Sequence, residues 1–486
     1  MRSRPTATGG LLPGSLLRVF SARSGALQHD LNRGADTYSH RMTNKGGTVV
    51  PPRPTTTRGG FGATPAPADA RAEGPRDVVF TFYGETWTDA QRRAMYMAGD
   101  RLLETLLSTQ AVRSLVVANP YRSAPIQWAR RLAGQRRVPF PEGPDRVLVE
   151  PRRLRRGDPI SVHALERASA RYDRVLEQAA ARVGARDPVV ITTNPFVAGF
   201  APLRWASRVT FYCWDDWTSG LPVRHWWPAY EEAYARVRAS GRGLVAVSQA
   251  IVDRVMPTGP SAVVPNGVVP GEWRSPRAAP SWFAVLPSPR ILYVGVIDDR
   301  LDTAAVREVA ARFSQGTVVL LGPVGDRTVV DPLRDIPNVR VEPPVGRAGV
   351  ASVVHAAEVC VMPHVRTRIT AAMSPLKLYE YLAGGRPVAA TDLPPVQAVD
   401  PRIVRVRDGE SFADGVAAAL DSGPLTEDER LAFIDANSWQ RRHAELLDLA
   451  FGTSFSSRAT RPRSAESADG TAGRGSRVAI RMGPDR

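Results

Sequence analysis

The chain has 486 residues, of which 43% are hydrophobic and 23% are charged, enough for two or three domains with ordinary cores. This composition excludes wholesale disorder and collagen-like repeats, and the presence of only two cysteines excludes a disulfide-stapled small domain. The net charge is +16, and no apolar stretch approaches the ~18 residues of a membrane-spanning helix. The sequence therefore favours a soluble or peripheral globular protein.

The two ends of the chain hold most of the positive charge. Residues 1–76 contain eleven Lys and Arg against four Asp and Glu, and residues 454–486 contain seven against three. Both segments are rich in Arg, Ser, Thr, Gly, Pro and Ala and show no apolar period, which predicts disordered basic tails. The first 29 residues lack acids, as transit peptides do, but an early start assignment in a bacterial chain, with Met42 as the alternative, is favoured.

Between the tails, strand-length apolar runs alternate with stretches of helical spacing. The first series of runs is 78–82, 115–117, 189–192, 209–212, 244–247 and 262–264. The second series is 291–294, 318–321, 339–341, 359–362 and 388–390. Continuous apolar runs suit strands that are covered on both faces, as in parallel sheets, and their alternation with helices predicts a doubly wound α/β architecture.

A proline-rich segment without a period separates the two series and predicts a domain boundary. We expect a Rossmann-like domain over 77–271, a linker over 272–287 and a second Rossmann-like domain over 288–425. A helical segment over 426–453 should precede the second tail. Because open parallel sheets bind ligands beyond the carboxyl ends of their strands, we expect the two domains to face each other across a cleft.

The segment 373–388 is the most informative in the chain. It reads Met-Ser-Pro-Leu-Lys-Leu-Tyr-Glu-Tyr-Leu-Ala-Gly-Gly-Arg-Pro-Val. Ser374 is a favourable N-cap and Pro375 suits the first helical position, so a helix should begin here. Gly384 should end this helix before the next strand.

Two charged residues lie on this short helix. Lys377 falls in the first turn, where a cation opposes the helix dipole, and an anion such as a phosphate would remove that conflict. Glu380 follows three residues later on the same side. A surface ion pair between the two side chains is the simpler alternative.

The segment resembles the nucleotide-sugar-binding helix of family 4 (group 1) glycosyltransferases of the GT-B fold, in a bacterial subgroup that reads Ser-Pro-x-Lys-x-x-Glu-Tyr. The runs 244–248, 263–268 and 291–295 agree with the family in order. This resemblance implies two Rossmann-like, doubly wound domains facing a cleft. It also implies retaining transfer of a sugar from a nucleotide-sugar donor to a glycan or lipid-linked acceptor, in cell-envelope or exopolysaccharide synthesis.

The resemblance assigns a donor site to the second domain. Glu380 matches the glutamate that holds the nucleotide ribose, and Ser374 and Lys377 match residues that line the diphosphate. The full set of implied donor-binding residues is Gly295, Arg300, His364, Ser374, Lys377 and Glu380. Lys377 and Arg300 should also act in catalysis, by stabilising the charge that grows on the leaving phosphate.

Two family positions are altered in this chain. The first glutamate of the family's Glu-x7-Glu pattern falls at Ala372, and the arginine of its Gly-Arg phosphate element falls at Val296. Arg300 is the nearest cation that could replace that arginine. These departures leave the sugar open but do not change the class much. They are the reason for the main alternative function, a non-catalytic GT-B-like protein that binds sugar or nucleotide or serves as a scaffold.

The resemblance assigns the acceptor to the first domain. Asp215 and Asp216, between two tryptophans, fall where the family has an active-site residue after its fourth strand. We expect both to contact acceptor hydroxyls, with Asp215 also catalytic, and Gly84 and Trp87 to contribute from the loop after the first strand. A metal site on the Asp pair and a purely capping role are the alternatives.

Other function classes lack their motifs. No Ser or Cys stands at a triad spacing from His225, His355 or His364, and no Gly-x-Gly-x-x-Gly follows the first strand. A nucleotide-sugar epimerase would need a set of carboxylates and histidines that cannot be assigned. We expect no cofactor, no metal and no nucleic acid partner. The chain should be cytoplasmic, with its basic tails favouring peripheral contact with the anionic inner face of the plasma membrane.

Overall fold

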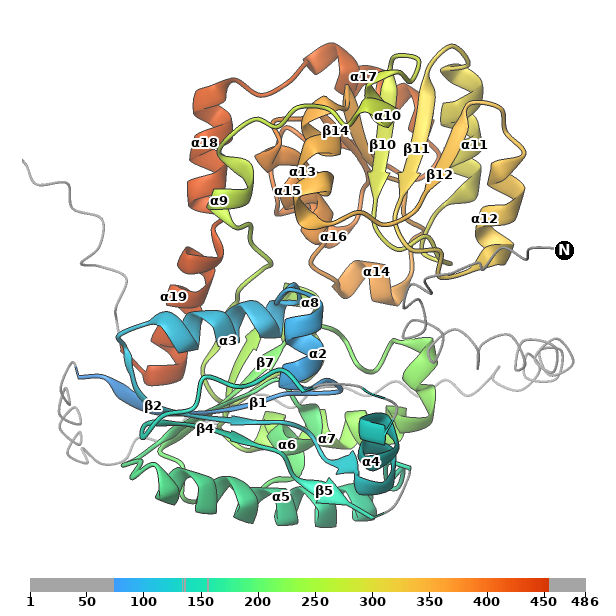
Figure 1. Ribbon diagram of the computed structural model, residues 1–486. Helices are drawn as coiled ribbons and strands as arrows, with labels where there is room; N and C mark the ends of the chain where they lie inside the picture. Colours follow the sequence, from blue (N-terminus) through green and yellow to red (C-terminus); the bar gives the residue numbers. More distant parts are fainter. Residues whose placement is uncertain (1–73, 133, 135–136, 155–156, 454–486) are drawn as a thin grey trace, which may run out of the picture.

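The computed structural model describes residues 74–453, apart from 133, 135–136 and 155–156. Within this part, the chain forms two α/β domains joined by a linker (Figure 1). The predicted basic tails lie outside the described residues, except for 74–76. Strand β1 (Arg76–Thr81) begins one residue before the predicted start of the first domain.

The first domain is built on a seven-stranded parallel sheet with the order β4-β2-β1-β6-β7-β8-β9. Its other strands are β2 (Val112–Ala118), β4 (Arg146–Val149), β6 (Val189–Thr192), β7 (Arg208–Cys213), β8 (Gly243–Ala246) and β9 (Ser261–Val263). All six predicted runs are confirmed as strands. The missed strand β4 lies at the edge, where its residues are only half-buried. A separate ribbon pairs β3 (Arg122–Ser123) with β5 (Arg152–Arg153).

The second domain is built on a six-stranded parallel sheet with the order β12-β11-β10-β13-β14-β15. Its strands are β10 (Arg290–Val294), β11 (Thr317–Leu321), β12 (Val339–Glu342), β13 (Val359–Met362), β14 (Val388–Thr391) and β15 (Val404–Val406). The five predicted runs of the second series are confirmed. The sixth strand, β15, was missed. It is an edge strand of three residues, and its two valines, separated by an arginine, do not form a run that indicates a strand.

Helices cover both faces of the first sheet. They are α2 (Trp87–Arg92), α3 (Ala98–Ser108), α4 (Ala124–Leu132), α5 (Val162–Arg182), α6 (Pro195–Phe200), α7 (Trp227–Ala239) and α8 (Gln249–Val255). A 3-10 helix, η2 (Leu221–Trp226), precedes α7. Val78 of β1 packs in one core with Leu102 of α3, whereas its neighbour Val79 packs in another with Leu176 of α5. This alternation is why the strand had to be apolar throughout.

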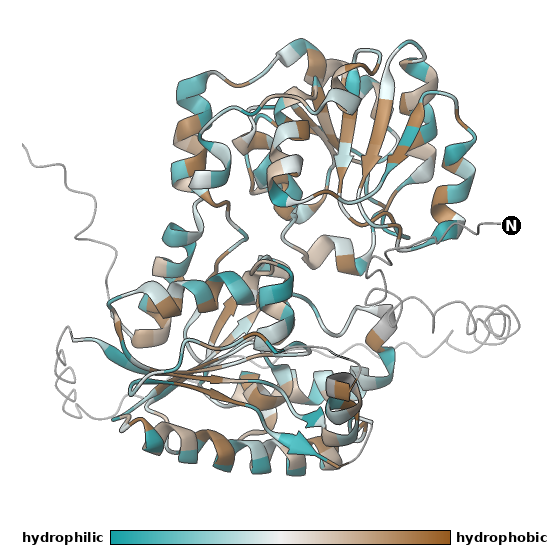
Figure 2. Ribbon diagram, in the orientation of Figure 1, coloured by the Kyte–Doolittle hydropathy of each residue, from teal (hydrophilic) through white to brown (hydrophobic). Residues whose placement is uncertain are grey.

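The second sheet is covered in the same way. Its helices are α11 (Thr303–Arg312), α12 (Arg327–Arg334), α13 (Arg347–Ala356), α14 (Arg368–Ala372), α15 (Leu376–Ala383), α16 (Pro394–Gln397) and α17 (Phe412–Ser422). Leu292 packs with Leu378 of α15, and Ile291 packs with Val309 of α11. Figure 2 shows the hydrophobic residues concentrated in the strands of both sheets.

The linker and the C-terminal segment connect the two domains twice. The proline-rich linker contains two short helices, α9 (Pro270–Trp273) and α10 (Ser281–Ala284). The predicted helical segment 426–453 divides into α18 (Glu427–Ala436) and α19 (Trp439–Phe451). Helix α18 packs against α15 and α9, whereas α19 returns to the first domain and packs against α3, β7 and β8 (Figure 1).

Loops at the carboxyl ends of the two sheets contact each other. Ser248, which follows β8, donates a hydrogen bond of 2.5 Å to the carbonyl of Ala372 in α14. Asn266, which follows β9, donates from its backbone to the Ser374 hydroxyl at 3.0 Å and from its side chain to the Ser374 carbonyl at 2.7 Å. Residues that follow β13 therefore lie against residues that follow β8 and β9.

None of the helices in the described part of the chain is both long and apolar enough to span a bilayer.

Candidate active site between the two domains

Helix α15 carries the predicted donor-binding residues. It begins at Leu376 with Pro375 as its N-cap, and Gly384 ends it as predicted. The predicted N-cap at Ser374 is therefore wrong by one residue. The Ser374 hydroxyl accepts a hydrogen bond from Asn266 of the opposite domain instead of capping the helix.

Lys377 projects onto two neutral side chains. Its Nζ donates to the Tyr293 hydroxyl at 2.9 Å and to His364 Nε2 at 3.0 Å, and it lies 4.1 Å from the centre of the Tyr293 ring. Within the described residues, Lys377 forms no ion pair, whereas Glu380 pairs with Arg347. The alternative of a surface pair between Lys377 and Glu380 is thus contradicted by the contacts of both side chains.

The surroundings of Lys377 favour the neutral form of its amine. Burial lowers the pKa of Lys377 to about 7, and the nearby Arg300 guanidinium adds to this effect. His364 is 2% exposed, and burial, together with the charges of Lys377 and Arg300, holds its pKa well below the usual range. A neutral His364 can accept at Nε2 while it carries its proton on Nδ1. A bound phosphate would favour the charged form of Lys377.

Gly295 and Arg300 lie beside this cluster. Gly295 follows β10 with a φ of +146°, a conformation that favours glycine, and a Cβ atom there would lie in tight contact with Lys377 Nζ, at 3.0 Å. The Arg300 guanidinium donates to Asp298 at 2.9 and 2.7 Å. The structure thus brings the predicted residues Gly295, Arg300, His364 and Lys377 together.

Glu380 lies one turn further along α15. It is 3% exposed, and its Oε1 accepts a hydrogen bond from Nη1 of Arg347, the first residue of α13. Burial raises the pKa of the Glu380 carboxyl above its usual range, and the Arg347 guanidinium opposes this rise. The carboxylate predicted to hold a ribose therefore has one oxygen fixed by an arginine.

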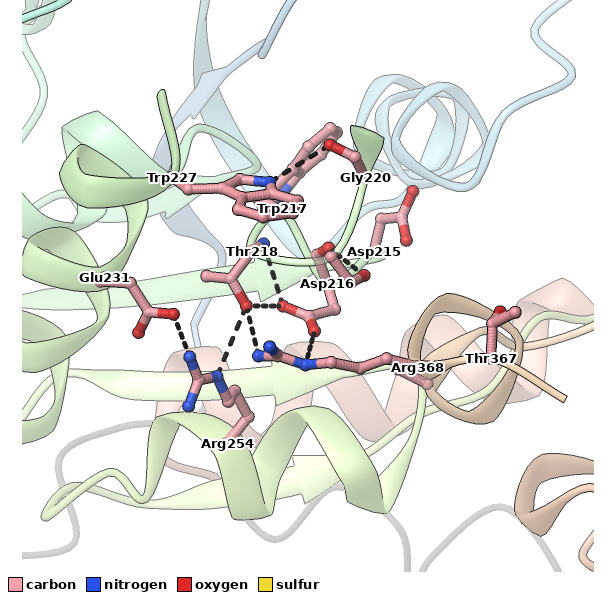
Figure 3. A network of polar contacts seen from close by, with 12 residues as sticks. Asp215, Asp216, Trp217, Thr218, Gly220, Trp227, Glu231, Arg254, Thr367 and Arg368 are labelled. Atoms are coloured by element: carbon pink, nitrogen blue, oxygen red, sulfur yellow. Dashed lines mark hydrogen bonds and ion pairs between the residues drawn. The ribbon is translucent and has the colours of Figure 1, made fainter. Parts of the chain in front are cut away.

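Asp215 and Asp216 have different surroundings although they are adjacent (Figure 3). Asp216 is 4% exposed, and its Oδ1 accepts hydrogen bonds from the Thr218 backbone at 3.1 Å and the Thr218 hydroxyl at 2.7 Å. Arg368 of α14 approaches its Oδ2 to 3.8 Å. These contacts fit the capping alternative for Asp216, which is engaged in closing the turn after β7.

Asp215 is only half-buried, and its backbone carbonyl accepts a hydrogen bond from the Cys213 thiol at 3.2 Å. Figure 3 shows its side chain directed away from Thr218 and Arg254. Burial raises the pKa of Asp215 to about 6, and the Arg300 guanidinium from the second domain opposes the rise. Asp215 therefore lies within the electrostatic reach of Arg300, across the boundary between the two domains.

The turn after β7 is held by residues from three other helices. Arg368 donates to the Thr218 hydroxyl at 3.0 Å, and Arg254 of α8 donates to the same oxygen at 3.4 Å (Figure 3). Arg254 in turn pairs with Glu231 of α7. This network links the second domain to the loop that carries Asp215.

The other two predicted acceptor residues behave differently from each other. Gly84 is exposed with a φ of +73°, and its carbonyl accepts a hydrogen bond of 2.5 Å from Arg122. Trp87 is 4% exposed, and its indole N–H donates to the carbonyl of Pro139 at 3.1 Å. Trp87 is a core residue, and the predicted contribution of Trp87 to acceptor binding does not fit this burial.

Three residues of the site were missed by the sequence interpretation, namely Tyr293, Arg347 and Arg368. Tyr293 is the one polar-tipped residue in the apolar run of β10, directly before Val294 and Gly295. Arg347 begins a helix after Gly346, where a cation opposes the dipole, and this is the signal that identified Lys377. Arg368 carries no comparable signal. In the described part of the chain, no three His, Cys, Asp or Glu side chains converge as metal ligands.

The second domain is similar in sequence to known proteins. Residues 288–422 match the family model of group 1 glycosyl transferases. A putative teichuronic acid biosynthesis glycosyltransferase of Bacillus subtilis (strain 168) is 30% identical over 130 residues, which are 26% of this chain. The match covers 32% of that relative, so this chain spans about a third of its length.

Solved structures show the architecture of the whole described chain. An α,α-trehalose 6-phosphate synthase from Burkholderia multivorans is 13% identical and superposes with a TM-score of 0.54, over 78% of this chain and 98% of the synthase. The fold is GT-B. The trehalose-6-phosphate enzyme of E. coli bound with UDP-2-fluoro glucose is 10% identical, with a TM-score of 0.51, over 77% of this chain and 99% of that one.

Proposed function

We propose that this GT-B chain is a retaining glycosyltransferase that moves a sugar from a nucleotide-sugar donor to a glycan or lipid-linked acceptor. The observation that carries the proposal is Lys377, a half-buried ammonium held by two neutral acceptors and without a carboxylate partner among the described residues. An ammonium has three donors, of which two are used, so the third is free for an anion. The diphosphate of a nucleotide sugar is such an anion.

The rest of the site fits this ligand. Glu380 lies one turn beyond Lys377, so a diphosphate on Lys377 would place a nucleoside within reach of the carboxylate, which would accept from its ribose hydroxyls. The group 1 family match covers this domain, and the E. coli neighbour of the same fold binds a UDP-sugar analogue. Synthesis of a cell-envelope polysaccharide is proposed from the name of the B. subtilis relative.

The chemistry requires no side-chain nucleophile in this proposal. As the leaving diphosphate departs, negative charge grows on its oxygens, and Lys377, Arg300 and the N-terminus of α15 would stabilise that charge. The leaving phosphate would take the proton of the acceptor hydroxyl, as is inferred for the family. Asp215 would orient that hydroxyl from the opposite domain.

A non-catalytic nucleotide-binding or scaffold protein remains the second candidate because of one observation. Ala372 stands where the family has its first glutamate, and its carbonyl is occupied by the Ser248 hydroxyl of the first domain. The methyl group of Ala372 cannot make the polar contact to the donor sugar that the glutamate makes. The two candidates differ in donor turnover but not in nucleotide binding.

A thermal-shift screen tests the nucleotide site. Binding raises apparent stability by RT ln(1 + [L]/Kd), which is about 2.7 kcal/mol at a hundredfold excess of ligand over Kd. We expect one or more of UDP, GDP, ADP and dTDP to raise the melting temperature, while the free nucleosides have a weaker effect. A panel that leaves the melting temperature unchanged would contradict the site.

The acceptor side predicts a pH dependence. Because Asp215 has a pKa of about 6, its carboxylate is ionised above that pH and gains a proton below it. The kcat/KM for the acceptor should therefore fall about tenfold per unit as the pH drops below this value. In Asp215→Asn the profile should be low and flat over the same range. A variant that retains the wild-type profile would exclude Asp215 from this role.

Turnover should also be independent of divalent metal, because Lys377, Arg300 and a helix end supply the positive charge. We expect EDTA to leave the rate unchanged and added magnesium or manganese to have no effect. If EDTA abolished turnover and a metal restored it, the carboxylate pairs Asp215-Asp216 and Asp298-Asp299 would become the candidate ligands.

A lipid-linked acceptor would require contact with the membrane surface. The basic ends of the chain, 1–76 and 454–486, supply charge for anionic lipids, and the side chains of Trp128 and Leu132 on α4 are 65% and 69% exposed. The purified chain should sediment with anionic vesicles at low salt and much less with neutral ones, and high salt should release it. Equal binding to both vesicle types would contradict the proposed contact.

A further inference from the structure

A chain of charged side chains connects the linker to the proposed ribose-binding carboxylate. Arg347 donates from Nη2 and Nε to Glu272 of the linker helix α9, at 2.6 and 3.1 Å, while its Nη1 donates to Glu380. Glu272 also accepts from Arg101 of α3, in the first domain, at 3.4 Å. The Arg347 guanidinium lies 5.2 Å from the centre of the Tyr96 ring. Arg347 is thus fixed from both domains.

Glu380 depends on this arginine. Its side chain is almost fully buried, and among the described residues Arg347 is its sole hydrogen-bond partner. The contact uses Oε1 and leaves Oε2 available to a ligand. A buried carboxylate without a cationic partner gains a proton at neutral pH, because burial disfavours the charged form.

We propose that Arg347 is a positioning residue for the nucleotide donor, which keeps the Glu380 carboxylate ionised and its free oxygen directed at the ribose hydroxyls. This inference rests on the proposed function, because it needs a nucleotide at Glu380. Arg347 itself would not touch the reacting atoms. It fixes the orientation and charge of the group that does the binding.

The charged groups around Glu380 show why Arg347 decides its ionisation. Arg347 on α13 and Lys377 on the same helix favour the carboxylate, whereas Glu272 on α9 opposes it. Tyr96 also faces this carboxylate, and burial, with Glu380 as a further cause, raises the pKa of its hydroxyl, which stays uncharged. Lys377 forms no ion pair with Glu380 and already loses much of its charge near pH 7. Without Arg347, burial and Glu272 would leave Glu380 protonated.

A purely structural role for Arg347 is the competing explanation, since a pair with Glu272 alone would fasten the linker to α13. The two roles differ in their pH dependence. Loss of a fastening contact would weaken nucleotide binding equally at every pH. Loss of a positioning cation would weaken binding most at low pH, because the carboxylate could still ionise as the pH rises.

The test measures Kd by calorimetry between pH 6 and pH 9, for the nucleoside diphosphate that wild type binds most tightly among UDP, GDP, ADP and dTDP. Arg347→Gln removes the charge, and Arg347→Lys restores it in part. Arg101→Gln serves as the matched control, because it removes the other arginine from Glu272 without touching Glu380. At each pH, the Kd of the variant is divided by that of wild type. Because both proteins contain Lys377, the effect of its titration on binding cancels in this ratio.

For Arg347→Gln, we expect a ratio at least about tenfold larger at pH 6 than at pH 9, because the carboxylate must lose a proton to bind. Arg347→Lys should reduce this slope, and Arg101→Gln should show none. A ratio near one, or a large ratio that does not change with pH, would overturn the inference. If wild type binds none of the four ligands, both the proposed function and this inference fail.

If Arg347→Gln is too unstable for binding measurements, a double variant still tests the inference. The double variant Arg347→Gln with Glu380→Gln contains no lone buried carboxylate, so it removes the charge that an unpaired Glu380 would leave in the core. It should bind nucleoside diphosphate as Glu380→Gln alone does. A further tenfold loss in the double variant would show that Arg347 acts independently of Glu380 and would overturn the inference.

Discussion

Replacing Lys377 by alanine should lower turnover at saturating donor by about 10²–10³-fold, the range for removing one group that stabilises a developing oxyanion. The reason is its position on the neutral pair Tyr293 and His364, where the remaining N–H of Nζ is free for the leaving phosphate. Charge grows on that phosphate during the reaction, so the turnover rate should fall more than donor affinity. Steady-state kinetics with the donor and acceptor varied separately would show this division.

Lys377→Arg is the informative companion variant. The sequence contains only two lysines, Lys45 and Lys377, among its 64 Lys and Arg residues, so all the other basic side chains of these two types are arginines. A guanidinium is larger than an ammonium, and the end of the Lys377 side chain already lies close to the backbone of Gly295, where an added Cβ would be 3.0 Å from Nζ. We expect Lys377→Arg to be nearly as inactive as Lys377→Ala. Wild-type turnover in either folded variant would contradict the phosphate role.

Replacing Glu380 by glutamine should weaken the binding of nucleoside diphosphate and donor by roughly 1–3 kcal/mol, the range for losing a hydrogen bond to a charged group. Glutamine has nearly the same shape but lacks the charge that ribose hydroxyls would donate to. These hydroxyls change little during the reaction, so turnover at saturating donor should stay close to that of wild type. Calorimetry with the diphosphate and a kcat determination would measure the two effects.

An exposed helix residue on α15 would behave differently from Glu380. An ordinary surface pair contributes only a few tenths of a kcal/mol to stability, so its loss would leave ligand affinity unchanged. Glu380 is instead only 3% exposed, and it pairs with Arg347 rather than with a neighbour on the helix surface. Unchanged donor affinity in a folded Glu380→Gln protein would remove the ribose assignment.

The sequence predicted the two sheets well because their strands are buried on both faces. Runs such as 318–321 need apolar residues at every position, and such runs can be recognised without a partner strand. The strands β4 and β15 lie at sheet edges, each is only three or four residues long with one arginine in it, and both were missed. The C-terminal segment was predicted as helical, but helical spacing does not indicate which domain a helix covers. The packing of α19 against the first domain was therefore not predicted.

The site was predicted in part for a related reason. Lys377 and Glu380 stand out because a cation and an acid at defined places on a short helix have local consequences. Their partners are distant in sequence, such as Tyr293, which lies 84 residues before Lys377, and no local pattern connects them. The same limit applies to Asp215 and Asp216, which the sequence treated as equivalent. Only the contacts of Asp216 with Thr218 and Arg368 separate the two.

Release of nucleoside diphosphate from nucleotide-sugar donors by the purified chain tests the proposed activity most directly. Donors based on UDP, GDP, ADP and dTDP would be offered with and without a bacterial lipid extract as the source of acceptor. We expect one donor class to be consumed, release to increase with the extract, and Lys377→Ala to abolish most of it. A chain that binds a nucleoside diphosphate yet consumes no donor under any of these conditions would contradict the proposed transferase activity. That result would favour the alternative function, a non-catalytic nucleotide-binding or scaffold protein.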